Sequence, residues 1–432
     1  MKRCQRRTSL ALMFGCLMTG PISSPSIAQE PDRGRAATEA ANQAAEADRL
    51  FKLGEFEAAL PLYEAERASR AKTGDLRYEA YALRAIGICQ AELGDDPAAI
   101  ASWREAFALD LKRDDPGFAG YDDFLIGQAE ARLGRPDDAI KSLERALPRL
   151  TGAADRDHEI DALLALTRIL VGSGRVEPAR THVAWALELA QKANEAWRIA
   201  DSWASSGQVE GASGHPEVAL DHFAKAQKLF EEQGRAAEAA WMETTSASAL
   251  VLLNRLDEAL PRYETAARLH KHLEDGGSTS EDLAAVAGLH LEAGRLDQAL
   301  IAAEEAVDQA RDADDRFREV EARVRLAQVQ GAKNDWTSAA DTLDEAVILG
   351  RQAARDDPAE QIRILLTAAA TDFRAGLAAR ADERIKAAET LAAESKSDDL
   401  KRTVADAATA LRPTLQSPRQ DQTPPSPMPP RQ

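Results

Sequence analysis

The chain has little of the chemistry from which most enzymes build a site. Of its 432 residues only 3 are cysteine and 7 are histidine, and aromatic residues make up 5%. The histidines show no metal-ligand spacing with carboxylate or cysteine partners, there is no phosphate-cradling glycine loop, and no serine has the Gly-x-Ser-x-Gly context of a nucleophile. The sequence therefore predicts a protein that is not an enzyme and that carries no metal or cofactor. Scarce aromatics with abundant alanine favour close-packed helices over a sheet sandwich.

The most suggestive polar groups have simpler explanations. His270 and His272 form the only close histidine pair, near the predicted end of a helix, and we interpret them as part of a solvated surface. Acidic pairs such as Asp114-Asp115 fall in predicted loops, where helix capping and solubility explain them.

Long hydrophobic runs are absent except for one short stretch near the N-terminus. Residues 1–28 combine a basic start, an apolar core from Leu10 to Met18 and a small-x-small end at Ser26-Ile27-Ala28. This pattern is typical of a cleavable secretory signal, and its core is too short to span a bilayer. We therefore expect a signal peptide over residues 1–28, cleavage before Gln29, and an exported, periplasmic protein.

Two features leave the mode of export open. Gly15-Cys16 resembles a lipoprotein signal, in which an acylated Cys16 would anchor the chain in the cell envelope, but Met13 and Phe14 fit that signal poorly. Arg6-Arg7 hints at twin-arginine export, although Ser9 stands where that signal has a bulky apolar residue. The alternative to a free periplasmic protein is thus an outer-membrane-type lipoprotein that acts as a structural or assembly factor.

The chain has an excess of negative charge. Its 54 Lys and Arg face 72 Asp and Glu, a net charge of −18, and loss of four basic residues with the signal would leave 50 against 72, or −22. Such a surface repels nucleic acid and anionic lipid, so neither is expected as a partner. Cleavage would also leave Cys89 as the single cysteine, which rules out an internal disulfide, and its position beside Ile86 and Ile88 predicts a semi-buried thiol rather than a reactive one.

The chain repeats with a period of 40 residues. One position of the repeat holds glycine or asparagine, the two residues that enter the left-handed conformation most readily at the end of a helix. These turn residues are Gly54, Gly94, Gly134, Gly174, Gly214, Asn254, Gly294, Asn334 and, after 42 residues, Gly376.

Small residues recur at three further positions of the repeat. Alanine follows every turn residue after five positions, from Ala59 to Ala381, and follows again seven positions later, from Ala106 to Ala388, with Glu66 as the one exception. A third small residue stands seven positions before each turn residue. Mostly apolar residues of varied size stand three before the last alanine: Tyr63, Trp103, Leu143, Val183, Phe223, Tyr263, Ala303, Leu343 and Ile385. Small side chains let two helices cross closely, so each repeat is predicted to be helix, tight turn, helix.

This pattern resembles the tetratricopeptide repeat (TPR) family over residues 37–395, with a 40-residue unit like that of the long-helix subclass seen in kinesin light chains and bacterial signalling scaffolds. The resemblance implies an all-α fold, a right-handed α-solenoid (superhelix) of about nine hairpins. Asp123, Glu243 and Arg323 depart from the family pattern, which has a bulky residue at this position of the first helix. Residues 397–412 fit a C-terminal capping helix that begins at Ser397, and residues 413–432, with seven prolines, are predicted to be a disordered tail.

In the family, the first helices of the repeats line a concave groove that holds a protein or peptide. The resemblance therefore implies a non-catalytic scaffold whose partner is a protein or peptide of unknown identity. Together with the predicted signal peptide, it leads us to expect a role within a bacterial cell-envelope complex. Carried over by repeat position, the groove residues are Tyr81, Arg84, Ile88, Tyr121, Phe124, Gln128, Arg132, Leu164, Arg168, Gln208 and Trp241, with Ala204, Thr244, Ser248 and Gln328 in later repeats. The three arginines among them would favour a carboxylate-bearing partner.

Overall fold

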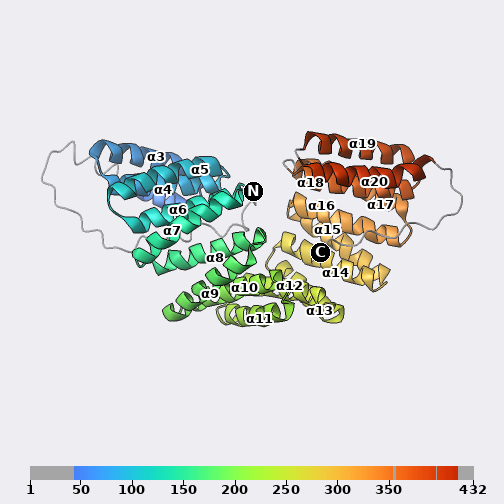
Figure 1. Cartoon of the computed structure of the whole chain (residues 1–432), viewed down its shortest axis with the longest axis horizontal. Helices are drawn as coiled ribbons and strands as arrows, with labels where there is room; N and C mark the ends of the chain where they lie inside the picture. Colours follow the sequence, from blue (N-terminus) through green and yellow to red (C-terminus); the bar gives the residue numbers. More distant parts are fainter. Residues whose placement is uncertain (1–42, 354–356, 396, 417–432) are drawn as a thin grey trace. The chain divides into compact units, whose positions relative to one another are not determined.

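The computed structural model describes residues 43–353, 357–395 and 397–416, with side chains up to Leu411. The predicted signal peptide and most of the predicted proline-rich tail lie outside these ranges. Within them every regular element is an α-helix and no strand occurs, which confirms the predicted all-α fold (Figure 1). No helix in the described ranges has both the length and the apolar character needed to cross a membrane.

The helices group into two compact units, which meet in sequence between Arg235 and Ala236. In unit 1 a helix over residues 43–52 precedes α3 (Phe56–Thr73), α4 (Leu76–Glu92), α5 (Asp96–Lys112), α6 (Pro116–Arg132), α7 (Pro136–Gly152), α8 (Arg156–Gly172), α9 (Val176–Ala193), α10 (Ala196–Ala212) and α11 (Pro216–Glu232). Unit 2 contains α12 (Ala236–Leu252), α13 (Leu256–His272), α14 (Gly276–Glu292), α15 (Leu296–Asp312), α16 (Arg316–Ala332), α17 (Trp336–Ala353), α18 (Pro358–Arg374), α19 (Ala378–Glu394) and α20 (Asp398–Gln416).

The helices pair into hairpins in which the even-numbered helix is the first helix and the next odd-numbered helix is the second. Within each unit, a first helix packs against its own second helix and against the second helix of the preceding hairpin, as α6 does with α7 and α5. Some neighbouring first helices also touch, as α6 does with α8 and α8 with α10. Each unit is thus a stack of hairpins in which each hairpin packs on its neighbours in the sequence, the arrangement of a solenoid.

The predicted turn residues adopt the predicted conformation. All nine, from Gly54 to Gly376, have positive φ, and Asn254 and Asn334 replace glycine at φ values of 56° and 64°. A second series of left-handed residues lies midway between them, in the loops that join successive hairpins: Gly74, Asp114, Ala154, Asn194, Gly234, Glu274 and Asp314. The residue types of this second series vary, so glycine spacing did not predict it.

Small residues lie where the helices cross, as the repeat pattern predicted. The first alanine after each turn is fully buried in every repeat, and Trp103 fills the space beside Gly87 so closely that a β-carbon there would lie 2.3 Å from the indole nitrogen. The positions that depart from the family pattern are compensated by opposite charge. Asp123 accepts hydrogen bonds from Arg145 and Arg149, and Glu243 accepts one from Arg262 at 2.9 Å.

The C-terminal helix α20 packs against α18 and α19 through Val404 and Ala408, which are buried. The Ser397 hydroxyl accepts a hydrogen bond from the backbone N–H of Leu400 at 3.3 Å, as an N-cap residue does. The helix continues to Gln416, beyond the predicted limit at residue 412.

Candidate functional site

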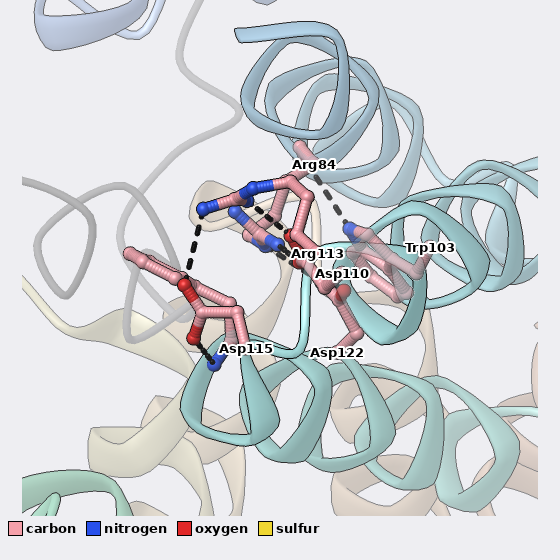
Figure 2. Close-up of polar contacts among 7 residues, drawn as sticks. Arg84, Trp103, Asp110, Arg113, Asp115 and Asp122 are labelled. Atoms are coloured by element: carbon pink, nitrogen blue, oxygen red, sulfur yellow. Dashed lines mark hydrogen bonds and ion pairs between the residues drawn. The ribbon is translucent and has the colours of Figure 1, made fainter. Parts of the chain in front are cut away.

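Arg84 is not a groove residue. Its guanidinium lies inside unit 1, where the side chain is 2% exposed and binds two carboxylates (Figure 2). Nε donates to Asp122 Oδ1 at 2.6 Å and Nη2 donates to Asp122 Oδ2 at 3.1 Å, while Nη2 also donates to Asp110. The backbone carbonyl of Arg84 accepts a hydrogen bond from the Trp103 indole at 3.2 Å. These contacts tie α4 to α5 and α6, so the residue joins two repeats instead of facing a ligand.

The cluster around Arg84 holds more negative than positive charge at its centre. Burial raises the pKa of Asp122 to about 7, although the Arg84 guanidinium opposes the shift. Asp110 shares Arg84 and also accepts a hydrogen bond from Arg113 at 2.6 Å, while Arg113 reaches Asp115 at 3.1 Å. Because Asp122 has no cation of its own, one arginine serves two buried carboxylates.

Four other predicted groove residues are buried as well: Ile88, Tyr121, Phe124 and Leu164 are at most 6% exposed. Ala204 and Thr244, at the helix position of Arg84 in later repeats, are buried too. The prediction is therefore corrected for these residues. For Phe124, Leu164, Ala204 and Thr244 the cause is geometric, because the helix position that they share with Arg84 packs against the neighbouring hairpin.

Two further predicted residues are accessible but already form hydrogen bonds to neighbouring side chains. Tyr81 is half-buried and its hydroxyl donates to Asp48 at 2.9 Å. Arg132 is accessible at the end of α6, and its Nη2 binds Asp96 at 2.6 Å. In unit 2, Trp241 is 42% exposed on α12.

The remaining three predicted residues form a row of accessible polar side chains in unit 1. Gln128, Arg168 and Gln208 occupy the same position on the consecutive first helices α6, α8 and α10, 40 residues apart. Arg168 is exposed and the two glutamines are half-buried, and none of the three has a hydrogen-bond partner among the described residues. We call Gln128, Arg168 and Gln208 the polar row.

The surroundings of Arg168 indicate a recessed position. Its side chain reaches solvent, yet desolvation by the surrounding protein lowers its pKa, and Asp201 and Asp161 offset that effect only in part. An exposed group that is also desolvated has protein on several sides. Arg168 is thus a cation with unused donors, and its planar guanidinium suits a carboxylate.

A second buried polar cluster, which was not predicted, lies in unit 2. His270 is 3% exposed, which corrects its interpretation as a solvated surface residue, and its Nδ1 lies 2.7 Å from Asp282 Oδ2. Thr244 donates to the other oxygen of Asp282 at 2.7 Å. The signal that could have revealed this cluster is the repeat itself, because Thr244, His270 and Asp282 occupy the positions of Arg84, Asp110 and Asp122 four repeats later.

Neither cluster has the geometry of a catalytic centre. The central side chains of the two clusters are buried and pair with one another: Arg84, Asp110 and Asp122 in unit 1, and Thr244, His270 and Asp282 in unit 2. In the described ranges no three His, Cys, Asp or Glu side chains converge as metal ligands would.

The sequence matches two family models. The model of the MalT-like TPR region matches residues 158–402, and a model of the tetratricopeptide repeat matches residues 123–192. No curated protein matches the chain.

Solved structures of similar fold share few residues with the chain. The signal transduction ATPase with numerous domains (STAND) and a tetratricopeptide repeat sensor, from Pyrococcus horikoshii, is 14% identical with a TM-score of 0.52, and the match covers 82% of this chain and 52% of that protein. The chain therefore spans about half the length of that protein. The apo form of the quorum sensor NprR from B. thuringiensis is 13% identical with a TM-score of 0.54, covering 72% of this chain and 87% of NprR. At these identities the likeness shows the fold alone.

Proposed function

The chain belongs to the MalT-like TPR family, and we propose that it is a non-catalytic scaffold that binds a protein or peptide partner along the polar row of unit 1. The observation that carries this proposal is the set of unused hydrogen-bonding groups on Gln128, Arg168 and Gln208. Long polar side chains at equivalent positions of three consecutive repeats present donors and acceptors in a line.

The chemistry of the polar row suits an extended peptide. A glutamine amide both donates and accepts, so it can pair with the N–H and C=O groups of a peptide backbone without selecting a side chain. Arg168 between the two glutamines adds a bidentate site for a carboxylate, either an acidic side chain or a C-terminus. The partner we propose therefore carries a carboxylate at the point where it crosses α8. A recognition role is consistent with two proteins of similar fold, since NprR is a quorum sensor and the repeats of the STAND protein form a sensor.

The test compares a row variant with a matched control. The row variant is Gln128→Ala/Arg168→Ala/Gln208→Ala. The control Lys112→Ala/Gln191→Ala/Gln233→Ala removes the same kinds of group from exposed positions on or just after second helices of unit 1, with the same change in net charge. Partners captured from the native cell envelope by the unchanged chain are identified and their affinities measured. Loss of two neutral hydrogen bonds and one charged pair is expected to weaken binding about a hundredfold in the row variant alone. A partner that binds both variants equally well overturns the proposal, provided that circular dichroism shows both to be folded.

We further propose that the protein is exported to the periplasm, as residues 1–28 predict. The alternative, an assembly factor anchored in the envelope through Cys16, rests on Gly15-Cys16. Mass spectrometry of the native N-terminus separates the two. A chain that begins at Gln29 supports the free periplasmic protein, an acylated Cys16 supports the anchored one, and an intact Met1 contradicts both.

A further inference from the structure

A pocket of about 330 Å³ lies in unit 1 at the N-terminal ends of α6 and α8. Its walls are formed by Asp115, Gly117, Phe118, Tyr121, Ala153, Asp155 and His158. The volume is at the small end of the range found for ligand sites, which suits a side chain or a small molecule rather than a cofactor.

The walls combine aromatic faces with carboxylates. The rings of Tyr121 and His158 are 4.3 Å apart between centroids and tilted by 48°. Phe118 forms another part of the wall, and the guanidinium of Arg84 lies 4.9 Å from the centre of its ring. Asp115 and Asp155 stand at the starts of α6 and α8, so one carboxylate comes from each helix.

Tyr121 lines this pocket, and its buried hydroxyl is an unused polar group. The residue is 1% exposed, and its oxygen has no hydrogen-bond partner among the described residues. A buried hydroxyl without a partner is destabilising, and a ligand that pairs with it would relieve that cost. This is the observation that marks the pocket as a binding site rather than a packing defect.

The charges around the hydroxyl are mainly negative. Burial raises the pKa of Tyr121, Arg84 opposes the shift, and the carboxylates of Asp122, Asp161 and Asp155 raise it further. The nearby cations are already paired. Arg84 binds Asp110 and Asp122, Arg113 binds Asp110 and Asp115, and Arg198 contacts Asp161 at 3.5 Å.

The helix ends themselves do not turn the pocket into an anion site. A free helix N-terminus attracts negative charge. Here the carboxylate of Asp115 accepts from the backbone N–H of Phe118 at 3.3 Å. That of Asp155 accepts from the backbone N–H of His158 at 3.4 Å, and its other oxygen lies 2.8 Å from Nδ1 of the same histidine. Both ends are therefore capped by a negative group of the chain, and an anion would meet those carboxylates first.

We propose that this pocket binds an alkylammonium group, supplied either by a lysine side chain of a partner or by a free small amine. The ammonium donates to the Tyr121 hydroxyl and lies near the Asp115 and Asp155 carboxylates, while the alkyl stem lies against the aromatic rings. Aromatic faces attract cations, and an ammonium group has only donors, which matches a pocket that offers acceptors. The inference does not depend on a partner occupying the polar row, since the pocket is complete without it.

The experiment uses the full chain and probes that differ by one group. Nα-acetyl-lysine amide has the ammonium and no free α-amine, and Nα-acetyl-norleucine amide has the same carbon stem without the ammonium. Binding is measured by nuclear magnetic resonance titration. The lysine probe is expected to bind at least tenfold more tightly than the norleucine probe. Equal binding of the two probes, or no binding of the lysine probe at tens of millimolar, overturns the proposal.

Variants then place the binding in the pocket. Tyr121→Phe removes only the unpaired oxygen. It is expected to weaken binding of the lysine probe about tenfold, the size expected for the loss of a hydrogen bond to a charged group. Asp155→Asn is expected to act in the same direction. Tyr263→Phe is the matched control in unit 2, where the hydroxyl already has Ser248 as a partner at 2.8 Å, and it should leave the affinity unchanged. Unchanged affinity in both pocket variants, or an equal loss in Tyr263→Phe, contradicts the proposed site.

A second probe separates the two sources of the amine. Tighter binding of n-butylammonium than of the lysine probe indicates a site for free amines, whereas tighter binding of the lysine probe indicates a protein partner. Acetate serves as the anionic control. If acetate competes with the lysine probe, the pocket is an anion site and the proposal fails.

Discussion

Asp282 occupies in unit 2 the position that Asp122 occupies in unit 1, four repeats of 40 residues earlier, and both carboxylates are completely buried. Each lies against side chains from the same two positions of the preceding repeat. Those positions hold Thr244 and His270 beside Asp282, and Arg84 and Asp110 beside Asp122. The same buried position of the repeat thus holds an aspartate with two different sets of partners. Asp122 pairs with an arginine, whereas Asp282 pairs with a hydroxyl and an imidazole.

The first prediction concerns replacing the partners of Asp122 with those that Asp282 has in unit 2. Arg84→Thr alone leaves Asp110 and Asp122 without their shared cation and is expected to cost about 3–5 kcal/mol, as breaking a buried ion pair does. Arg84→Thr/Asp110→His rebuilds the arrangement of unit 2 around Asp122 and is expected to recover more than half of that loss. Hydrogen exchange of the α4–α6 amides measures the change locally, since a solenoid need not unfold in a single step. A double variant no more stable than the single one would show that the two sites are not interchangeable.

The second prediction concerns pH. Burial places the pKa of Asp122 at about 7, above its unfolded value of about 3.8. The folded chain therefore holds a proton that the unfolded chain releases, and the stabilisation from this proton is complete below about pH 4 and lost as the pH rises through 7. The difference in unfolding free energy between the unchanged chain and Asp122→Asn should fall across this interval by more than about 1 kcal/mol, because each pKa unit corresponds to about 1.4 kcal/mol. Urea titrations of both proteins at pH 4, 5.5 and 7 measure it, and a difference that stays constant or rises contradicts the assigned pKa.

The third prediction uses the loop between α7 and α8. Ala154 has a φ of 57°, a conformation that costs a residue with a β-carbon about 1–2 kcal/mol. Ala154→Gly removes that cost and is expected to stabilise unit 1 by about 0.5–1 kcal/mol after the entropy of glycine is counted. Ala313→Gly, at a C-cap with a φ of −80°, is the control and should be destabilising by a similar amount. Thermal unfolding followed by circular dichroism distinguishes the two variants. Equal shifts of the unfolding temperature would show that backbone strain at Ala154 is not the cause.

The fourth prediction concerns Cys89, the one cysteine among the described residues. Burial raises the pKa of its thiol to about 12, so little thiolate exists at neutral pH. In a Cys4→Ser/Cys16→Ser background, the folded chain should react with Ellman's reagent at least about a thousandfold more slowly than a free thiol, and at the ordinary rate in urea. Rapid reaction of the folded chain would mean that α4 opens readily.

The sequence by itself determined the repeat. Each 40-residue unit contains, within a short stretch of chain, the turn residue, the small residues at the helix crossings and the apolar residues that pack between them. The left-handed turns from Gly54 to Gly376 and the buried alanines after them follow from residue type alone, since only certain residues fit those backbone angles and those close contacts. The repeat position of Gln128, Arg168 and Gln208 was likewise predicted to be accessible, and these three residues reach solvent, but Ile88 at the same position is buried.

Only the tertiary structure decided which polar groups remain free. Arg84 and Arg168 were both predicted as groove residues, yet Arg84 is buried with two carboxylates from α5 and α6, whereas Arg168 reaches solvent. The partners of Arg84 come from residues 26 to 38 positions away, and helical periodicity does not specify such contacts. The unpaired Tyr121 hydroxyl likewise depends on what two successive hairpins leave between them. Local propensity selects the helices and turns, whereas burial and pairing are properties of the stack.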